Sequence, residues 1–395
     1  MLKKTFLFLC IFNFAFFIFA QNTNNSKTIK FLKGNISDKT AAVREASGNE
    51  AVWLSNKAID YSIENKAILG NDRDLDGLAV AAVLSISNDY VKTATEAQKT
   101  ELSNKLNQIY TDFQTSKTVE IAILTKIVTL KDSLPLDSFV KTINNNLKTQ
   151  NLNSIDSSVL KTTLTALNQI GNAESSIIIY YFYSTNKYEQ YNDDFEKTLI
   201  ELSLNSMTES INIIQDVNFE SLRKIYGIYT KNSKISKNNL CTISEIVLNK
   251  SILLMGNSLQ VSKDDIDLQI TALKTLSENK WTRASTTALS YFQIAEKLYE
   301  AKTMNSEDFT VVISSLSSIT PVTAVSPLTS YLEELNRQKE AGADVASDVV
   351  LSVIKTLGAI GDKSAFDSLL AVTYLNYEES ILSAAREALA GLRWQ

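Results

Sequence analysis

The sequence predicts an all-α fold, an α-solenoid of stacked helix pairs that follows an N-terminal secretion signal. The first observation behind this prediction is an apolar stripe that recurs along the chain with one spacing, typical of one face of a helix. A stripe that returns every few dozen residues indicates helix pairs that bury their apolar faces only by stacking on one another. The stripe occupies Leu160, Leu164, Leu167 and Ile170; Ile266, Ile270, Leu273 and Leu276; Phe309, Ile313, Leu316 and Ile319; and Val350, Ile354, Leu357 and Ile360.

The second observation is that residues that interrupt helices are scarce. The 395 residues include three prolines and eleven glycines, whereas ordinary usage is about 5% proline and 7% glycine. This composition favours long helices with short turns over a β protein. The chain is also longer than one compact core usually supports, which agrees with a repeat array.

The third observation concerns the residues at predicted helix ends. Glycine followed by Asn or Asp closes several helices, as at Gly171, Gly256 and Gly361. Acidic residues open the second helix of many pairs, where a carboxylate accepts hydrogen bonds from free backbone N–H groups and complements the helix dipole. These acids are Asp156, Asp193, Asp194, Asp264, Asp265, Glu307, Asp308, Asp348, Glu378 and Glu379.

These signals divide the chain into a leader at 1–20, a polar linker at 21–37 and an array of about nine helix pairs over 38–395. The predicted pairs are 50–66 with 73–88, 97–113 with 116–131, 135–149 with 156–171, 173–186 with 192–206, 208–216 with 218–231, 239–256 with 263–279, 281–303 with 306–319, 322–340 with 344–360, and 363–376 with 379–393. In each pair we name the first helix A and the second helix B.

The leader has the pattern of a cleavable bacterial signal peptide. Lys3 and Lys4 precede an almost unbroken apolar run, and Ala20 precedes a polar stretch. We therefore expect cleavage before Gln21 and an exported protein of the periplasm or cell envelope. Two alternatives are an uncleaved membrane anchor and a lipid on Cys10.

The charge balance argues against a nucleic-acid partner. Lys and Arg number 39 against 44 Asp and Glu, a net charge of −5, and phosphate binding needs clustered positive charge. Loss of the leader leaves one cysteine, Cys241, so we expect no intramolecular disulfide. Its apolar surroundings favour a buried small side chain over a reactive thiol.

The region 344–393 resembles the HEAT repeats of bacterial proteins. Leu357-Gly358-Ala359-Ile360-Gly361-Asp362 is similar to the "ALGxIGD" end of a HEAT B helix, and 385–392 is similar to the same helix in a final repeat. A fainter similarity lies at 42–46, and the match is poor over 187–262. The resemblance implies a right-handed armadillo-like superhelix of antiparallel helix pairs, which usually binds proteins. It implies no catalytic residues.

The composition also limits the chemistry that the chain can perform. It contains no histidine, the commonest general base and metal ligand. With one cysteine after cleavage, we expect no zinc or iron–sulfur site, no cofactor and no catalytic residues. The three tryptophans, Trp53, Trp281 and Trp394, are scattered rather than clustered as in a glycan-binding cleft.

One acidic cluster has two interpretations. Asp72, Asp74 and Asp76 precede Gly77 as in the first half of an EF-hand calcium loop, but Val83 stands where the bidentate glutamate belongs. The favoured interpretation is a turn and an N-cap for the following helix.

Two further features could form a binding surface. The aromatic segment around Tyr180 and Tyr183 is apolar on all sides of its helix, so it is either buried in the stack or a partner-binding patch. The faces of B helices opposite the stripe are uncharged and rich in hydroxyl groups, which suits either a protein partner or close helix packing. The latter residues are Thr162, Thr165, Gln169, Thr271, Thr275, Ser314, Ser315 and Ser318.

We therefore expect a non-enzymatic protein-binding scaffold of the cell envelope, at most peripheral to the membrane, whose partner is a protein or peptide and not nucleic acid. The alternatives are an all-α toroidal envelope enzyme that acts on glycans through paired carboxylates, and an assembly factor of the chaperone or lyase type.

Overall fold

The computed structural model describes residues 26–185 and 187–393. The chain is 78% helical, and the described residues form 21 α-helices and no strand. This confirms the predicted all-α fold. The predicted leader at 1–20 and Trp394 lie outside the described residues.

The chain divides into two compact units. Unit 1 runs to Ile178 and includes Tyr188–Thr198, and unit 2 contains Ile179–Lys187 and the residues from Leu199 onward. Helices α11 (Ala173–Ser184) and α12 (Asn192–Leu202) each contribute residues to both units.

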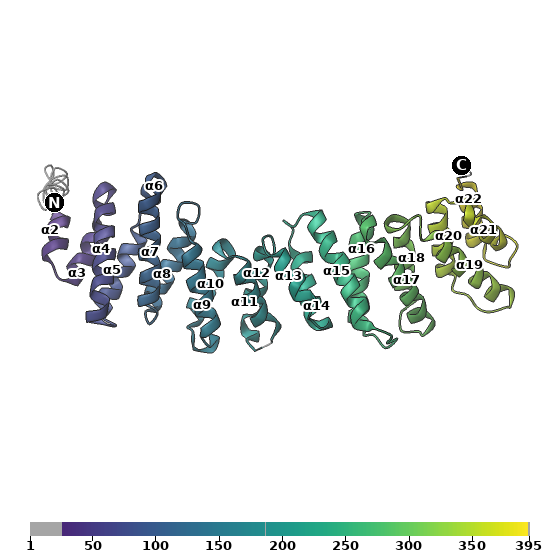
Figure 1. Cartoon of the computed structure of the whole chain (residues 1–395), viewed down its shortest axis with the longest axis horizontal. Helices are drawn as coiled ribbons and strands as arrows, with labels where there is room; N and C mark the ends of the chain where they lie inside the picture. The colour runs from purple at the N-terminus through teal and green to yellow at the C-terminus, as the bar shows by residue number, and fades with distance from the viewer. Residues whose placement is uncertain (1–25, 186, 394–395) are drawn as a thin grey trace, which may run out of the picture. The chain divides into compact units, whose positions relative to one another are not determined.

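Unit 1 consists of helical hairpins whose alternate helices contact one another. Helix α5 packs against α4 within a hairpin and against α8 of the next, and α8 in turn packs against α10 (Figure 1). The A helices α4, α7 and α9 form a second row of contacts. The helices are α2 (Ser26–Lys33), α3 (Ile36–Glu45), α4 (Gly48–Leu69), α5 (Arg73–Leu84), α6 (Asn88–Thr93), α7 (Glu96–Asp112), α8 (Lys117–Thr129), α9 (Asp137–Thr149) and α10 (Ser157–Ile170).

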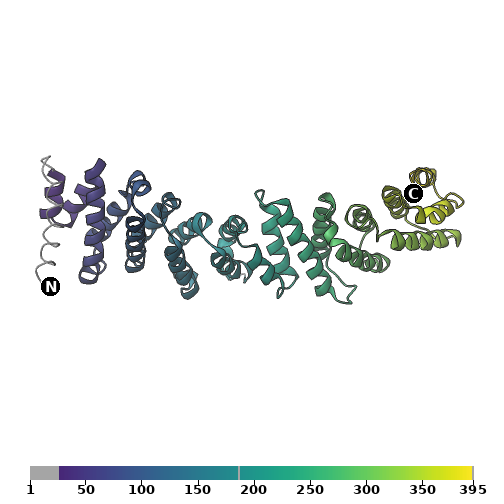
Figure 2. The same cartoon turned by 45° about the horizontal axis from the view of Figure 1, so that its top comes forward.

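Unit 2 shows the same alternation over its C-terminal part. Helices α16, α18, α20 and α22 contact one another in sequence, and each packs against the helix that precedes it. Figures 1 and 2 show these helices side by side in both views. The helices are α13 (Met207–Ile214), α14 (Phe219–Lys231), α15 (Lys237–Met255), α16 (Lys263–Glu278), α17 (Ser285–Glu300), α18 (Ser306–Ile319), α19 (Val325–Glu340), α20 (Ser347–Ile360), α21 (Phe366–Val372) and α22 (Glu379–Ala390).

The predicted apolar stripes form the cores of the hairpins. Every stripe residue on α16, α18 and α20 is buried, and on α10 only Ile170 is partly exposed. Ile170 is the last residue of α10. Burial of each Leu, Ile or Phe side chain contributes about 1.5–3 kcal/mol to folding, so burial of the stripes stabilises the hairpins.

The predicted helix ends are largely confirmed. Asp156 is the N-cap of α10 and accepts a hydrogen bond from the backbone N–H of Ser158 at 2.8 Å. Gly361 ends α20 in the left-handed conformation at φ +70°, which glycine adopts without steric cost. Asn305 caps α18 instead of the acids of its first turn, and Ser262 caps α16.

The structure corrects two parts of the predicted layout. The stretch 21–37 is not wholly a linker, because Ser26–Lys33 forms helix α2 with Phe31 buried against the following helices. The helix predicted at 73–88 ends at Leu84, and α6 begins at Asn88 after the N-cap Ser87. Phe31 and Ile86 are buried at these two places.

Buried amide side chains connect neighbouring hairpins. In unit 1, Asn144 of α9 accepts a hydrogen bond from the Ser175 hydroxyl at 2.9 Å. In unit 2, Asn336 of α19 donates to the Ser368 carbonyl at 3.1 Å and accepts from the Tyr377 hydroxyl at 3.2 Å. Because an unpaired buried amide is costly, these bonds favour one register of adjacent hairpins.

Candidate binding groove

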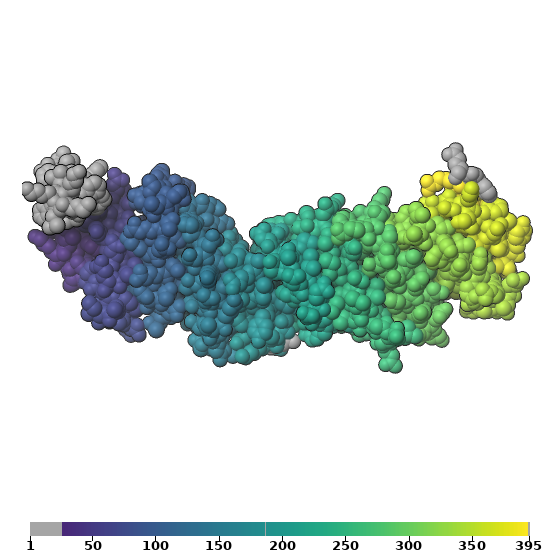
Figure 3. Space-filling view, viewed as in Figure 1, coloured from purple at the N-terminus to yellow at the C-terminus, as the bar shows by residue number. Residues whose placement is uncertain are grey.

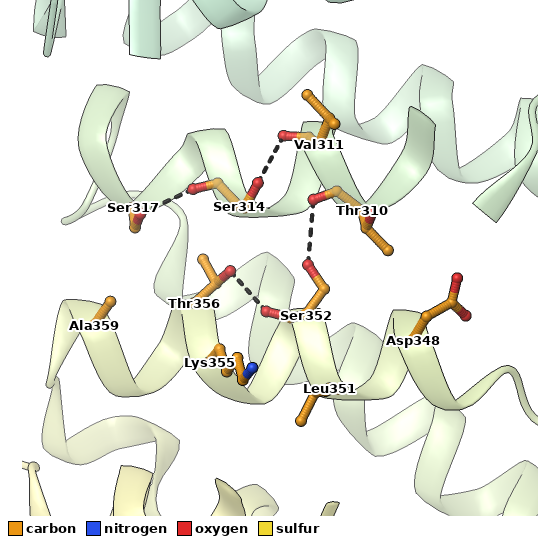
Figure 4. A pocket seen from close by; sticks show the side chains of 10 residues that line it. All are labelled: Thr310, Val311, Ser314, Ser317, Asp348, Leu351, Ser352, Lys355, Thr356 and Ala359. Carbon is orange, nitrogen blue, oxygen red and sulfur yellow. Dashed lines mark hydrogen bonds between the residues drawn. The ribbon is translucent and has the colours of Figure 1, made fainter. Parts of the chain in front are cut away.

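An open groove of about 480 Å³ lies between α18 and α20 in unit 2 (Figure 4). The apolar stripe of α18 turns Phe309, Ile313 and Leu316 into the core. The opposite side of the helix therefore faces the groove. It contributes Thr310, Val311, Ser314 and Ser317.

Helix α20 forms the other side of the groove, because its apolar face is also turned into the core. Val350, Val353, Ile354, Thr356 and Leu357 are buried, whereas Leu351, Ser352 and Lys355 reach the surface. The residues of α20 that line the groove are Asp348, Leu351, Ser352, Lys355, Thr356 and Ala359.

The hydroxyl groups of the groove donate their protons to nearby backbone carbonyls. Ser352 donates across the groove to the Thr310 carbonyl at 3.2 Å, and Thr356 donates to the Ser352 carbonyl at 2.7 Å. Ser314 and Ser317 donate to carbonyls of their own helix at 3.1 and 2.8 Å. Their oxygen lone pairs remain available, so the groove offers mainly acceptors for the N–H groups of a ligand.

Charged side chains are few in this groove. Asp348 lies near one end, and Lys355 lies two helical turns further along α20, about 10 Å by helix geometry. A serine or threonine here has no histidine to activate it, because the chain has none.

The structure distributes the predicted hydroxyl-rich residues over both units. Thr162, Thr165 and Gln169 lie on α10 of unit 1, whereas the others lie on α16 and α18 of unit 2. Thr162 and Thr165 donate to backbone carbonyls of their own helix at 2.7 and 2.8 Å, and Gln169 accepts from Lys131 at 2.7 Å.

On α16, Thr271 is exposed and bonds back to the Asp267 carbonyl, while Thr275 is partly buried beside the Tyr226 hydroxyl at 3.2 Å. On α18, Ser314 lines the groove and Ser318 shares a hydrogen bond of 2.7 Å with Ser277 of α16. The expectation for Ser315 was wrong, because this residue is buried beside the stripe.

The α20 side of the groove was missed in the sequence. The signal was present, since Asp348, Ser352, Lys355 and Ala359 lie opposite the stripe of α20. These residues form a groove only because α20 lies beside α18, and the periodicity of the sequence does not specify which helices are neighbours.

The acidic cluster at the start of α5 has the structure of a helix cap. Asp72 is the N-cap and accepts a hydrogen bond from the Leu75 N–H at 2.9 Å, and Asp76 lies 3.8 Å from the Lys66 amine. These contacts confirm the turn and N-cap interpretation. Over residues 26–185 and 187–393, no three His, Cys, Asp or Glu side chains are grouped to hold a metal ion.

The other residues singled out by sequence are mostly buried. Cys241 is buried, and burial raises the pKa of its thiol, which keeps it protonated. In the aromatic segment Ile179, Tyr180 and Phe182 are buried while Tyr181 is exposed. Most of the apolar side chains of this segment are therefore explained by packing within the fold.

Unit 1 contains a carboxyl group with a perturbed pKa. Glu120, in the first turn of α8, is partly buried, and this burial with the nearby negative charge of Asp156 raises its pKa to about 7. Asp156 itself has a lowered pKa, because it accepts hydrogen bonds from Ser158 and from Lys117, whose amine lies 3.1 Å away.

No protein-family model matches this chain, and no curated protein or solved structure does either. Within the part of the chain that the structure describes, no helix combines the length and the apolar character needed to cross a membrane.

Proposed function

We propose that this protein is a non-enzymatic, exported scaffold with a HEAT-like α-solenoid fold, and that it binds an extended segment of a partner protein along its B helices. The groove between α18 and α20 is the central part of the proposed surface. The observation that carries the proposal is its lining of outward-facing hydroxyl and small apolar groups with one charge of each sign.

The contacts within each unit support the solenoid part of the proposal. In repeat proteins each helix pair contacts only its neighbours, and here α16, α18, α20 and α22 form such a series. The motif around Gly358 supports the HEAT-like assignment. Export is supported by the basic and apolar residues of the leader.

A peptide fits the chemistry of the groove. The hydroxyl oxygens of Thr310, Ser314 and Ser352 can accept hydrogen bonds from the backbone N–H groups of a peptide, and Lys355 can donate to a peptide carbonyl or carboxylate. Nucleic acid fits poorly, because phosphates need several cations and the groove lining has one.

The glycan-cleaving alternative requires two carboxyl groups about 5–10 Å apart on either side of a cleft. The groove lining contains one carboxylate, Asp348. This favours binding over catalysis at this site.

Site-specific photocrosslinking in the native organism tests the proposal. A photoreactive amino acid at Ala359, an exposed residue of the groove, should yield one dominant adduct with a protein. Ser314→Lys should abolish the adduct, because it places a charge in the centre of the interface. Gln293→Lys on α17 is the matched control on an exposed A-helix position and should leave the adduct intact.

Two outcomes would contradict the proposal. Equal adduct yields with Ser314→Lys and Gln293→Lys would remove the groove from the binding surface. If Asp348→Asn abolishes the cellular phenotype while the adduct persists, catalysis must be reconsidered.

A further inference from the structure

Helix α2 is fixed to the end of unit 1 by its inward face. Phe31 is buried, and its ring meets the Trp53 ring edge-on at 6.4 Å between centroids. The Phe31 carbonyl accepts a hydrogen bond from the Lys39 amine at 2.5 Å, and the Lys27 amine donates to the Glu45 carbonyl at 2.5 Å. These contacts define which side of the helix points outward.

The outward side of α2 carries two large apolar residues. Ile29 is 52% exposed and Leu32 is 62% exposed. They are three residues apart and so are neighbours on the helix surface, on the side away from Phe31. Figure 3 shows the first described residues, in dark purple, on the surface at the end of unit 1. A terminal helix of a repeat array usually has a polar outer face, so this exposure is unexpected.

Basic residues flank this apolar pair. Helix α2 contains Lys27, Lys30 and Lys33 and no acidic residue. Lys33 lies one turn from Ile29 and is exposed, and Lys30 is partly exposed at 3.7 Å from the Glu45 carboxylate. A short helix with apolar residues bordered by lysines is typical of segments that lie in a membrane interface.

The charges distinguish between the possible occupants of this surface. Residues 1–25 contain two lysines and no acid, so they offer no negative charge to α2. A second copy of the same face would bring lysines against lysines. A bilayer with anionic lipids offers both an apolar phase and a negative surface.

We propose that α2 is a docking site for an anionic phospholipid surface. Ile29 and Leu32 enter the boundary between headgroups and acyl chains, while Lys30 and Lys33 lie among the phosphates. This site is in unit 1, separate from the groove between α18 and α20, and it does not depend on the protein-binding proposal.

An environment-sensitive fluorophore tests this contact at the residue itself. The full chain is prepared with Cys10→Ser and Cys241→Ser, and the probe nitrobenzoxadiazole is attached at Leu32→Cys. Vesicles of equal parts phosphatidylglycerol and phosphatidylcholine should shift its emission to the blue and increase it. Leu253→Cys, an equally exposed position at 69% on α15 of unit 2, is the matched control and should not respond.

The charge requirement is tested on the same labelled protein. Lys30→Gln with Lys33→Gln should raise the vesicle concentration for half-maximal response by about fivefold for each lysine, and added salt should act in the same direction. Three results would overturn the proposal: no response at residue 32, an equal response at residue 253, or an equal response with pure phosphatidylcholine vesicles. An equal response at residue 253 would indicate adsorption that is not specific to α2, and an equal response with pure phosphatidylcholine would assign membrane binding to the apolar leader instead.

Discussion

Gly358 of α20 packs directly against Ala388 of α22. A Cβ atom added at Gly358 would lie 2.9 Å from the Ala388 Cβ and 3.1 Å from its Cα, closer than side chains pack. The absence of a side chain at residue 358 thus allows the two B helices to approach closely. Gly358 therefore has a packing role, whereas Gly361, three residues later, ends the helix in the left-handed conformation.

Gly358→Ala should therefore destabilise unit 2, although alanine is the better helix former. Overpacking costs about 1–3 kcal/mol, which exceeds the gain of about 0.5–1 kcal/mol from helix propensity. Amide hydrogen exchange should accelerate in α20 and α22. The matched control is Gly77→Ala in α5, where an added Cβ meets nothing within 4 Å. This control should be neutral or stabilising, and equal destabilisation by both changes would contradict the role assigned to Gly358.

Leu273→Asp should unfold part of unit 2 and leave unit 1 protected. Leu273 is fully buried on α16, and an unpaired charge there costs several kcal/mol. In a stack of neighbouring contacts the damage should centre on residues 239–319. Lys274→Asp, at the adjacent exposed position, is the control and should change little. Hydrogen exchange with mass spectrometry separates the two cases, and a uniform loss of protection across both units would argue for a single cooperative core.

The stability of unit 1 should fall as pH rises toward 7. The folded state raises the pKa of Glu120 from 4.5 to about 7, so in this interval the folded chain keeps a proton that the unfolded chain has released. Glu120→Gln should remove this dependence. Above pH 7 it should raise the free energy of unfolding by about 1 kcal/mol, a figure reduced for solvent screening, and below pH 4.5 it should have little effect.

Urea unfolding at a series of pH values measures this effect. Glu64→Gln on α4, an exposed glutamate of the same unit, is the control and should leave the pH dependence unchanged. If Glu120→Gln and the wild type lose stability in parallel as pH rises, another group is responsible.

Asp72→Ala should lower the stability of unit 1 by about 1 kcal/mol, because the Leu75 N–H loses its acceptor. Asp74→Ala removes only a favourable charge near the helix N-terminus and should cost a few tenths of a kcal/mol. Adding calcium should leave the thermal unfolding midpoint of each of the three proteins unchanged. A calcium-dependent rise in the wild type that disappears in Asp74→Ala would restore the calcium-loop interpretation.

The fold class and most helix boundaries were predictable because their signals are local. A stripe such as Phe309, Ile313, Leu316 and Ile319 specifies one face of a helix without any knowledge of its neighbours. Caps such as Asp72 and Gly361 act on backbone groups a few residues away. The absence of histidine is likewise read directly from the composition and needs no knowledge of the fold.

The candidate sites depended on contacts between residues far apart in the chain, and only the tertiary structure decided them. The groove exists because α18 and α20 are neighbours, and Gly358 matters because Ala388 lies opposite it. Glu120 has a raised pKa because the fold buries it near Asp156. Phe31 turns inward and leaves Ile29 and Leu32 exposed, so a segment predicted as a linker is a packed helix with an apolar outer side. Sequence periodicity specifies the buried face of each helix, whereas the identity of the side chains across from it is set by packing.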